Sequence, residues 1–226
     1  SYNKSLRMPT FTDLFYDGPT NEGNPDLQPE EASTIETGVK YVSSFVTGHV
    51  TGFYRRGKNL IDWGRTQGED VYTTSNVNKI NARGIEVETT LLPGEIGVPL
   101  LKKIQLGYAW LDQDKKAEEG YESVYVLNHL RHKANIGVHH QIWKSLSARW
   151  NFLYQDRKGH FTRSEDDVRV EYEPVWLTDI RMMWQQGTWQ VYAEATNLFD
   201  KKYFDMGELE RPGRWIKGGV TFSLDY

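Results

Sequence analysis

Several features that would assign the chain to other classes of protein are missing from its sequence. Cysteine is absent, which excludes a disulfide framework and a thiolate metal site. No run of about 18 apolar residues occurs, so the chain is not a helical membrane protein. The formal net charge of −4 gives no support for nucleic-acid binding. No signal peptide is visible at Ser1, so we expect that, if the protein is exported, this chain is its mature form or a piece of it.

What the sequence does contain is many aromatic side chains and a two-residue alternation of apolar and polar positions. Aromatic residues make up 13%, a proportion typical of a barrel with aromatic girdles at both membrane interfaces. From Val220 to Tyr226 every second residue is apolar or aromatic, which predicts a strand with one apolar and one polar face. Soluble proteins avoid ending on such a strand, because its free edge invites aggregation. Outer-membrane β-barrels end in this way.

The same alternation recurs along the chain and predicts an all-β fold, an antiparallel up-and-down meander of about nine or ten strands. The predicted strands are residues 2–8, Ser33–Val42, Val46–Trp63, Val71–Leu92, Ile104–Gln113, Val124–His140, Leu146–Gln155, Val175–Gln185, Trp189–Phe199 and Arg214–Tyr226. Tight links such as the one at Gly187 alternate with long polar segments such as Lys158–Glu171. Transmembrane barrels show this asymmetry between short turns and long external loops, and the segment Pro93–Lys102 is the one exception to it.

The two faces of these strands have different compositions. One face, expected to point inward, carries Glu36, Lys40, Glu86, Glu88, Arg149, Asn151, Asp179, Arg181, Glu194 and Lys217. The other face, expected to point toward lipid, carries Trp63, Tyr108, Trp110, Trp143, Trp150, Trp176, Trp184 and Trp189. Amphipathic rings prefer the level of the lipid headgroups, so the second face favours a membrane barrel over a soluble sandwich.

Three segments of the chain carry motifs of a known family. The first is Arg7–Tyr41, with the run Asn-Pro-Asp-Leu-Gln-Pro-Glu from Asn24 to Glu30. The second contains Asn-Leu-Ile-Asp-Trp at Asn59–Trp63 and Gly-Ile-Glu at Gly84–Glu86. The third is Ala195–Asp205, with Asn-Leu-Phe-Asp, followed by Gly213 and Arg214. In this order, the segments resemble TonB-dependent outer-membrane receptors, and most of all the cobalamin receptors.

This resemblance implies more than the fold. Family members have an N-terminal plug and a barrel of about 22 strands. Residues 1–226 would be the C-terminal part of such a barrel, without the plug, its TonB box and the first strands. The resemblance implies no enzyme activity and no cofactor. It implies active import of a scarce large nutrient across the bacterial outer membrane, with membrane lipid and the TonB system, reached through the plug, as partners. Cobalamin is the favoured substrate, and a ferric siderophore or haem is the alternative.

Candidate substrate contacts lie in the segments expected to form external loops. These are Phe11, Phe15, Tyr16, Asn24, Phe161 and Phe204. Aromatic rings suit stacking on a flat macrocycle, although packing within the loops explains each ring equally well. Asn24 lies in a turn-forming run and could serve turn geometry instead.

Other polar groups have ordinary explanations beside the sharper ones. His129 and His132 are three apart, which places them on opposite faces of a strand and argues against a shared metal. We expect a solvated or loop-proximal pair instead. The acidic run at Ser164–Asp167 lacks the spaced ligands of a calcium loop. Glu86 and Glu88 could form a catalytic pair but are expected to line the interior as polar residues. Two rival classes remain open: a small complete outer-membrane barrel, either pore or enzyme, and a soluble all-β binding module.

Overall fold

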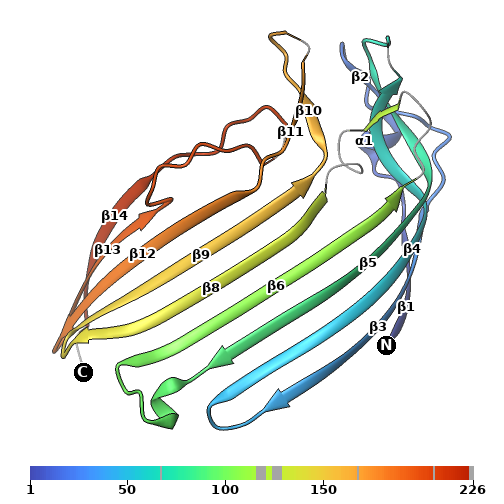
Figure 1. Ribbon diagram of the computed structural model, residues 1–226. Helices are drawn as coiled ribbons and strands as arrows, with labels where there is room; N and C mark the ends of the chain where they lie inside the picture. Colours follow the sequence, from blue (N-terminus) through green and yellow to red (C-terminus); the bar gives the residue numbers. More distant parts are fainter. Residues whose placement is uncertain (67, 116–120, 124–128, 167, 206, 224–226) are drawn as a thin grey trace. The chain divides into compact units, whose positions relative to one another are not determined.

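In the computed structural model, the chain is built almost entirely from antiparallel strands (Figure 1). The structure describes residues 1–66, 68–115, 121–123, 129–166, 168–205 and 207–223. Ten strands are hydrogen-bonded in the order β1-β3-β4-β5-β6-β8-β9-β12-β13-β14. Because this order follows the chain, the predicted up-and-down meander is confirmed.

The bounds of the ten strands agree closely with the alternation pattern. They are β1 (Tyr2–Arg7), β3 (Glu30–Val42), β4 (Val46–Thr66), β5 (Tyr72–Leu91), β6 (Leu101–Lys115), β8 (His129–Trp143), β9 (Leu146–Lys158), β12 (Val175–Gln186), β13 (Trp189–Thr196) and β14 (Trp215–Phe222). The predicted starting residue Val124 and the predicted last residue Tyr226 lie outside the described residues.

The long connections contain short elements that the alternation pattern missed. These are α1 (Phe11–Phe15), β2 (Asn21–Glu22), the 3-10 helix η1 (Pro93–Ile96), β7 (Tyr121–Ser123), β10 (His160–Thr162) and β11 (Arg169–Glu171). The segment Lys158–Glu171, predicted to be a loop, therefore contains the β10–β11 hairpin. Elements of two to five residues are too short to show a hydrophobic period. Neither helix in the described ranges is long and apolar enough to cross a membrane.

The chain divides into two compact units. The first unit consists of residues 1–38, 51–85 and 111–129, and the second of residues 39–50, 86–110 and 130–226. In the second unit, the tight turns β8–β9 and β12–β13 lie at one end of their strands, and the β10–β11 hairpin lies at the other end of β9 and β12 (Figure 1). The turn between β12 and β13 uses Gly187 at φ +56°, a left-handed conformation that favours glycine.

Cross-strand register sorts the side chains of the second unit onto two faces. Trp176 lies opposite Tyr154 and Trp189 opposite Phe222, and the ring centroids in both pairs are 4.7 Å apart. Opposed residues of an antiparallel pair share a face. The aromatic face of this unit therefore includes Leu106, Tyr108, Ile136, Trp150, Phe152, Tyr154, Trp176, Met182, Trp184, Trp189, Val191, Val220 and Phe222.

The opposite face is polar, and the register again aligns its members. Asp179 pairs with Asn151, Arg181 with Glu194, and Glu194 with Lys217. The polar face of the second unit includes Glu86, Glu88, Gln105, Lys133, Asn135, Arg149, Asn151, Asp179, Arg181, Glu194 and Lys217. A shift of one residue in any pairing would exchange the two faces, so the register is set by the alternation itself.

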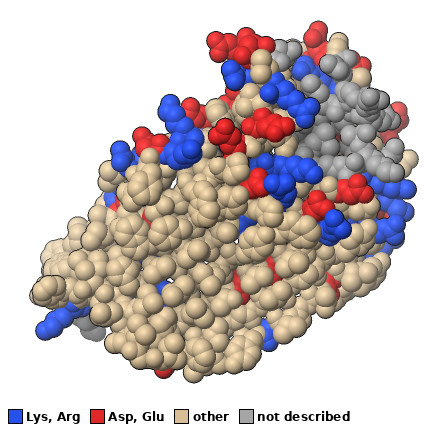
Figure 2. Space-filling model, in the orientation of Figure 1, with Lys and Arg blue, Asp and Glu red and all other residues tan. Residues whose placement is uncertain are grey.

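Many large apolar side chains of the aromatic face are exposed. Leu106, Ile136 and Val220 are 39%, 40% and 62% exposed, as are many other large apolar side chains of this face. Figure 2 shows a broad surface over the strands with few Lys, Arg, Asp or Glu atoms. A water-exposed apolar surface of this extent indicates contact with an apolar medium. The soluble sandwich, whose apolar faces would pack against each other, does not fit this arrangement.

The assignment of the aromatic face to lipid leads to a paired test at the middle of β8. Ile136→Arg places a charge on the aromatic face and is expected to lower the free energy of unfolding by about 2–4 kcal/mol in phospholipid vesicles. Asn135→Arg places the same charge on the polar face, next in sequence, and is expected to change it by less than about 1 kcal/mol. Urea titration of the protein in vesicles measures both. Equal losses for the two variants would contradict the lipid assignment.

Candidate functional site

The first group of predicted contact residues lies on and beside α1, in the first unit. Thr10 caps this helix: its hydroxyl accepts from the Asp13 amide at 3.1 Å, and its own amide donates to the Asp13 carboxylate at 2.9 Å. The reciprocal pair satisfies donors that a helix start leaves free. It also buries Asp13, whose exposed fraction is 8%. The helix start is therefore fixed to its loop, although α1 has only five residues.

Backbone and side-chain hydrogen bonds then fix α1 to β5. The carbonyl of Asp13 accepts from the hydroxyl of Thr74 at 2.7 Å and from the amide of Asn24 at 2.9 Å. Thr74 is only 1% exposed. Gly23 lies against the helix so closely that a Cβ there would come within 2.9 Å of the backbone of Leu14 and Phe15. This loop is consequently a packed structure rather than an open chain.

The same geometry shows what Asn24 does. Its side-chain amide donates to the carbonyl of Thr74 at 3.2 Å, and its side-chain oxygen accepts from the amide of Asp26 at 2.9 Å. Both ends of the side chain are thus engaged within the loop, as the turn-forming interpretation expects. A substrate contact by Asn24 stays a prediction.

The three aromatic residues of this loop are presented differently. Phe11 is 78% exposed, Phe15 56% and Tyr16 47%. The rings of Phe11 and Phe15 lie 5.1 Å apart, and Tyr16 meets the edge of Trp63 at 6.1 Å. Exposed aromatic rings on a fixed backbone offer a large contact area, and their side chains lose little conformational entropy when a ligand binds. Ligand contact by Phe11, Phe15 and Tyr16 stays a prediction.

A neighbouring network connects the ends of β1, β3, β4 and β5 in this unit. Arg7 donates to the carboxylate of Glu30 at 2.9 Å, and the same carboxylate accepts from the amide of Ile61 at 2.8 Å. Asn76 bridges the loop and β4, accepting from the Gln28 amide at 2.8 Å and donating to the Asn59 carbonyl at 2.8 Å. The motif Asn24–Glu30 therefore supplies hydrogen-bonding groups that hold the loop of residues 10–24, here called the α1 loop, against its strands.

The second group, Phe161 and Phe204, lies in the second unit and forms an aromatic cluster. The two rings are 5.2 Å apart, and Phe161 also contacts Tyr172 at 5.5 Å. Tyr172 is 7% exposed, and its hydroxyl accepts from the amide of Gly207 at 2.8 Å. Arg157 adds an ion pair to Asp205 at 2.8 Å. Phe161 and Phe204 thus link the connection that follows β9 to the one that follows β13.

Sequence reasoning missed Tyr172, Arg157 and Asp205 as members of this cluster. Arg157 and Asp205 are 48 positions apart, and no local pattern connects them. Only the return of the chain through β12 and β13 brings them together. Phe204 remains 39% exposed, so this cluster combines loop packing with an accessible aromatic edge.

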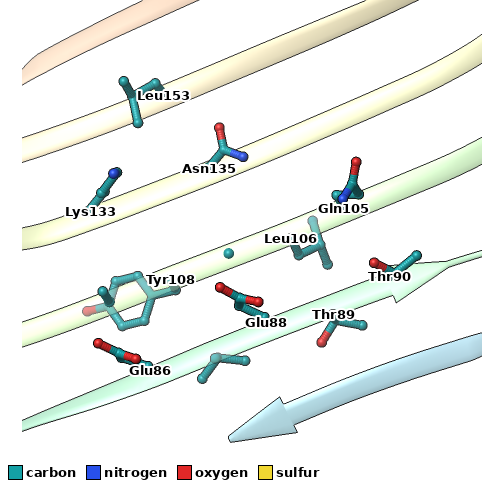
Figure 3. Close-up of a pocket in the computed structure, with 13 residues that line it drawn as sticks. Glu86, Glu88, Thr89, Thr90, Gln105, Leu106, Tyr108, Lys133, Asn135 and Leu153 are labelled. Atoms are coloured by element: carbon teal, nitrogen blue, oxygen red, sulfur yellow. The ribbon is translucent and has the colours of Figure 1, made fainter. Parts of the chain in front are cut away.

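Strand residues of the second unit form a hollow on its polar face. It has a volume of about 570 Å³ and is lined by Glu86 and Glu88 of β5, Gln105 and Gly107 of β6, and Lys133 and Asn135 of β8 among others. Figure 3 shows the carboxylates of Glu86 and Glu88 on β5 and the side chains of Lys133 and Asn135 on β8. Glu86 and Glu88 therefore share this hollow with a cation and amides, as lining residues would.

The histidines considered as metal ligands have other surroundings. His132 lies 2.8 Å from the hydroxyl of Tyr108 through Nδ1, and Nε2 of His140 accepts from the indole of Trp150 at 3.2 Å. His129 is buried rather than solvated, with an exposed fraction of 6%. Within the described ranges, no three His, Asp or Glu side chains converge as a metal site would require.

Removal of the Thr74 hydroxyl tests how the α1 loop is held. Thr74→Val keeps the shape of the side chain but leaves the Asp13 carbonyl with one partner fewer, which is expected to cost about 1–3 kcal/mol of local stability. Amide hydrogen exchange across residues 10–24 should accelerate correspondingly. Thr73→Val, at an exposed position one residue earlier, is the control and should leave exchange unchanged. Equal exchange in both variants would contradict this role of Thr74.

The contact between the loops of the second unit is expected to depend on pH through Glu208. The hydroxyl and the amide of Ser164 donate to this carboxylate at 2.6 and 2.9 Å and lower the pKa of Glu208. A lowered folded-state pKa means that the contact is at full strength above the ordinary glutamate pKa and is lost as the pH falls through the lowered value. Exchange of the Ser164 amide, measured against pH, should rise in that acid range. Glu208→Gln should remove the pH dependence.

Comparison with known proteins agrees with this architecture. Residues 1–198 match the family model described as TonB dependent receptor-like, beta-barrel. The Vitamin B12 transporter BtuB of Vibrio vulnificus (strain YJ016) is 23% identical over 204 residues, which cover 90% of this chain and 30% of that protein. The chain therefore spans about a third of the length of this relative.

Solved structures show the same fold at lower identity. The copper transporter OprC aligns with a TM-score of 0.74 at 16% identity, over 99% of this chain and 36% of its own. A mutant of the ferric enterobactin receptor from Pseudomonas aeruginosa, in complex with enterobactin, aligns with a TM-score of 0.66 at 19% identity, over 98% of this chain and 37% of its own. With its meander, its two unlike faces and a family match over most of its length, the chain belongs to the TonB-dependent receptors, a family of bacterial outer-membrane proteins.

Proposed function

We propose that the chain forms the C-terminal part of a larger transmembrane barrel, with the plug and the N-terminal strands contributed by sequence outside residues 1–226. Two observations support this proposal. The matched transporter and receptor structures are about three times as long as this chain. The outermost strands of the meander, β1 and β14, each pair with one neighbour only within the described sheet. Such edges are stable when further strands continue the sheet.

The intact protein would be an active transporter that takes up a scarce large nutrient and draws energy from the TonB system through the plug. It would carry out no bond-making chemistry. Outer-membrane lipid would contact the aromatic face, and the nutrient would contact the loops. Nucleic acid is not among the proposed partners.

We infer that the nutrient is cobalamin. The observation that carries this inference is the 204-residue similarity to a vitamin B12 transporter, which runs through nine-tenths of the chain. The exposed rings of Phe11, Phe15 and Tyr16 suit this ligand, because a flat macrocycle offers a large apolar surface to aromatic side chains. A ferric siderophore is the second candidate, supported by fold similarity to the ferric enterobactin receptor.

Binding to the intact protein in detergent separates these candidates. Cyanocobalamin and ferric enterobactin are titrated in parallel, and binding is followed by quenching of tryptophan fluorescence. We expect the Phe45→Ala variant, a control at the tight turn that follows β3, to bind cyanocobalamin saturably. Phe11→Ala or Tyr16→Ala is expected to weaken this binding about two- to tenfold. If the protein binds ferric enterobactin but not cyanocobalamin, the proposed substrate is a ferric siderophore and not cobalamin. Equal affinities in all variants would exclude the α1 loop as the contact surface.

A further inference from the structure

A row of ionisable side chains crosses the polar face of the second unit near the tight turns. Its members are Lys103, His139, Arg149, Arg181, Glu194 and Lys217. Lys103 pairs across strands with His139, and Arg149 pairs with Arg181. Glu194 is the only carboxylate in the row, so the row carries an excess of positive charge.

The direct opposition of Arg149 and Arg181 is unfavourable by itself. Like charges that face each other across an antiparallel pair destabilise it. Arg181 donates to Glu194 at 3.3 Å, but Glu194 also pairs with Lys217 at 3.0 Å and so is shared between two cations. Arg149 is exposed and forms no hydrogen bond or ion pair with any residue that the structure describes. The repulsion between the two guanidinium groups is therefore left without a counter-charge of its own.

The next carboxylate along β12 does not supply that counter-charge. Asp179 accepts from the side-chain amide of Asn151 at 3.4 Å and from the backbone amide of Asn197 at 2.9 Å. One oxygen is thus engaged by Asn151 on β9 and the other by Asn197, which follows β13. An anion that neutralised Arg149 would thus have to come from outside this part of the sheet.

The two arginines open onto a small hollow with further donors. Its volume is about 190 Å³, and it is lined by His139, Ser147, Arg149, Arg181 and Met183. Ser147 is only 8% exposed, and its hydroxyl has no hydrogen-bond partner in the described part of the chain. Arg181 is held in place from two sides, because its guanidinium also lies 4.1 Å from the centre of the Tyr192 ring. One guanidinium is thus preorganised and the other is free to close on a ligand.

We propose that this hollow is a binding site for an oxyanion, a carboxylate or phosphate group held by Arg149 and Arg181 with the Ser147 hydroxyl as a third donor. The guanidinium fork matches the geometry of both groups and binds them through paired hydrogen bonds. A bound oxyanion would cancel the repulsion between the arginines and satisfy Ser147. The same chemistry can be presented by free phosphate or by an acidic side chain of a polypeptide segment.

Titration of the intact protein in detergent, followed by calorimetry, distinguishes the two sources. One arm uses inorganic phosphate, and the other uses a short peptide with blocked ends and two glutamates. Wild-type protein should bind at least one probe, and the probe bound identifies the source. Arg149→Gln should weaken that binding about tenfold or more, because it removes a charged donor. Arg169→Gln, which removes an exposed arginine of β11 outside the row, is the control and should bind as wild type does.

A second variant covers the case in which R149Q does not fold. Arg149→Lys keeps the charge but loses the fork, so it should retain the fold and still weaken binding about threefold or more. Circular dichroism and heat-modifiable migration on a gel report the fold of each variant. The proposal is overturned if wild-type protein binds neither probe, or if the folded Arg149 variants bind as tightly as R169Q.

Discussion

Cross-strand register is the constraint on which the rest of this structure depends. Each strand has a period of two, and opposed residues of an antiparallel pair share a face. The register that places Trp176 against Tyr154 also places Asp179 against Asn151. A slip of one residue would turn rings toward the polar side and carboxylates toward lipid, where no water would solvate them. The separation into an aromatic and a polar face therefore requires the correct register in every strand pair at once.

The long connections depend on the strands but obey a different rule. Their backbone groups form hydrogen bonds with specific polar partners. The carbonyl of Asp13 accepts from Thr74 and Asn24, and the hydroxyl of Tyr172 accepts from the amide of Gly207. Buried polar groups must be paired, so these contacts decide where each loop lies. The backbone that carries the exposed rings of Phe11 and Phe15 is positioned by this polar framework.

Charge is balanced in some parts of the sheet and left unbalanced in others. Arg131 meets Asp156 and Arg83 meets Asp112, at 2.6 and 2.9 Å. The pair Arg149–Arg181 is an exception, because the neighbouring carboxylates, Glu194 and Asp179, are bonded to other groups. Groups that break a local rule without compensation within the chain are the places where a ligand or partner is expected.

The sequence alone determined the strands, their faces and the family. Alternation extended over ten strands, and their predicted bounds agree with the structure within a few residues at most described ends, because one face of every strand had to be apolar. Only the tertiary structure revealed α1, the β10–β11 hairpin and the Arg157–Asp205 pair. These features are short or join residues far apart in the chain, so they leave no periodic signal. The tertiary structure also decided that the Asn24 side chain is hydrogen-bonded within its loop while Phe11 is exposed. The partner of Asn24 on β5 is distant in the chain, so no local pattern specifies this contact.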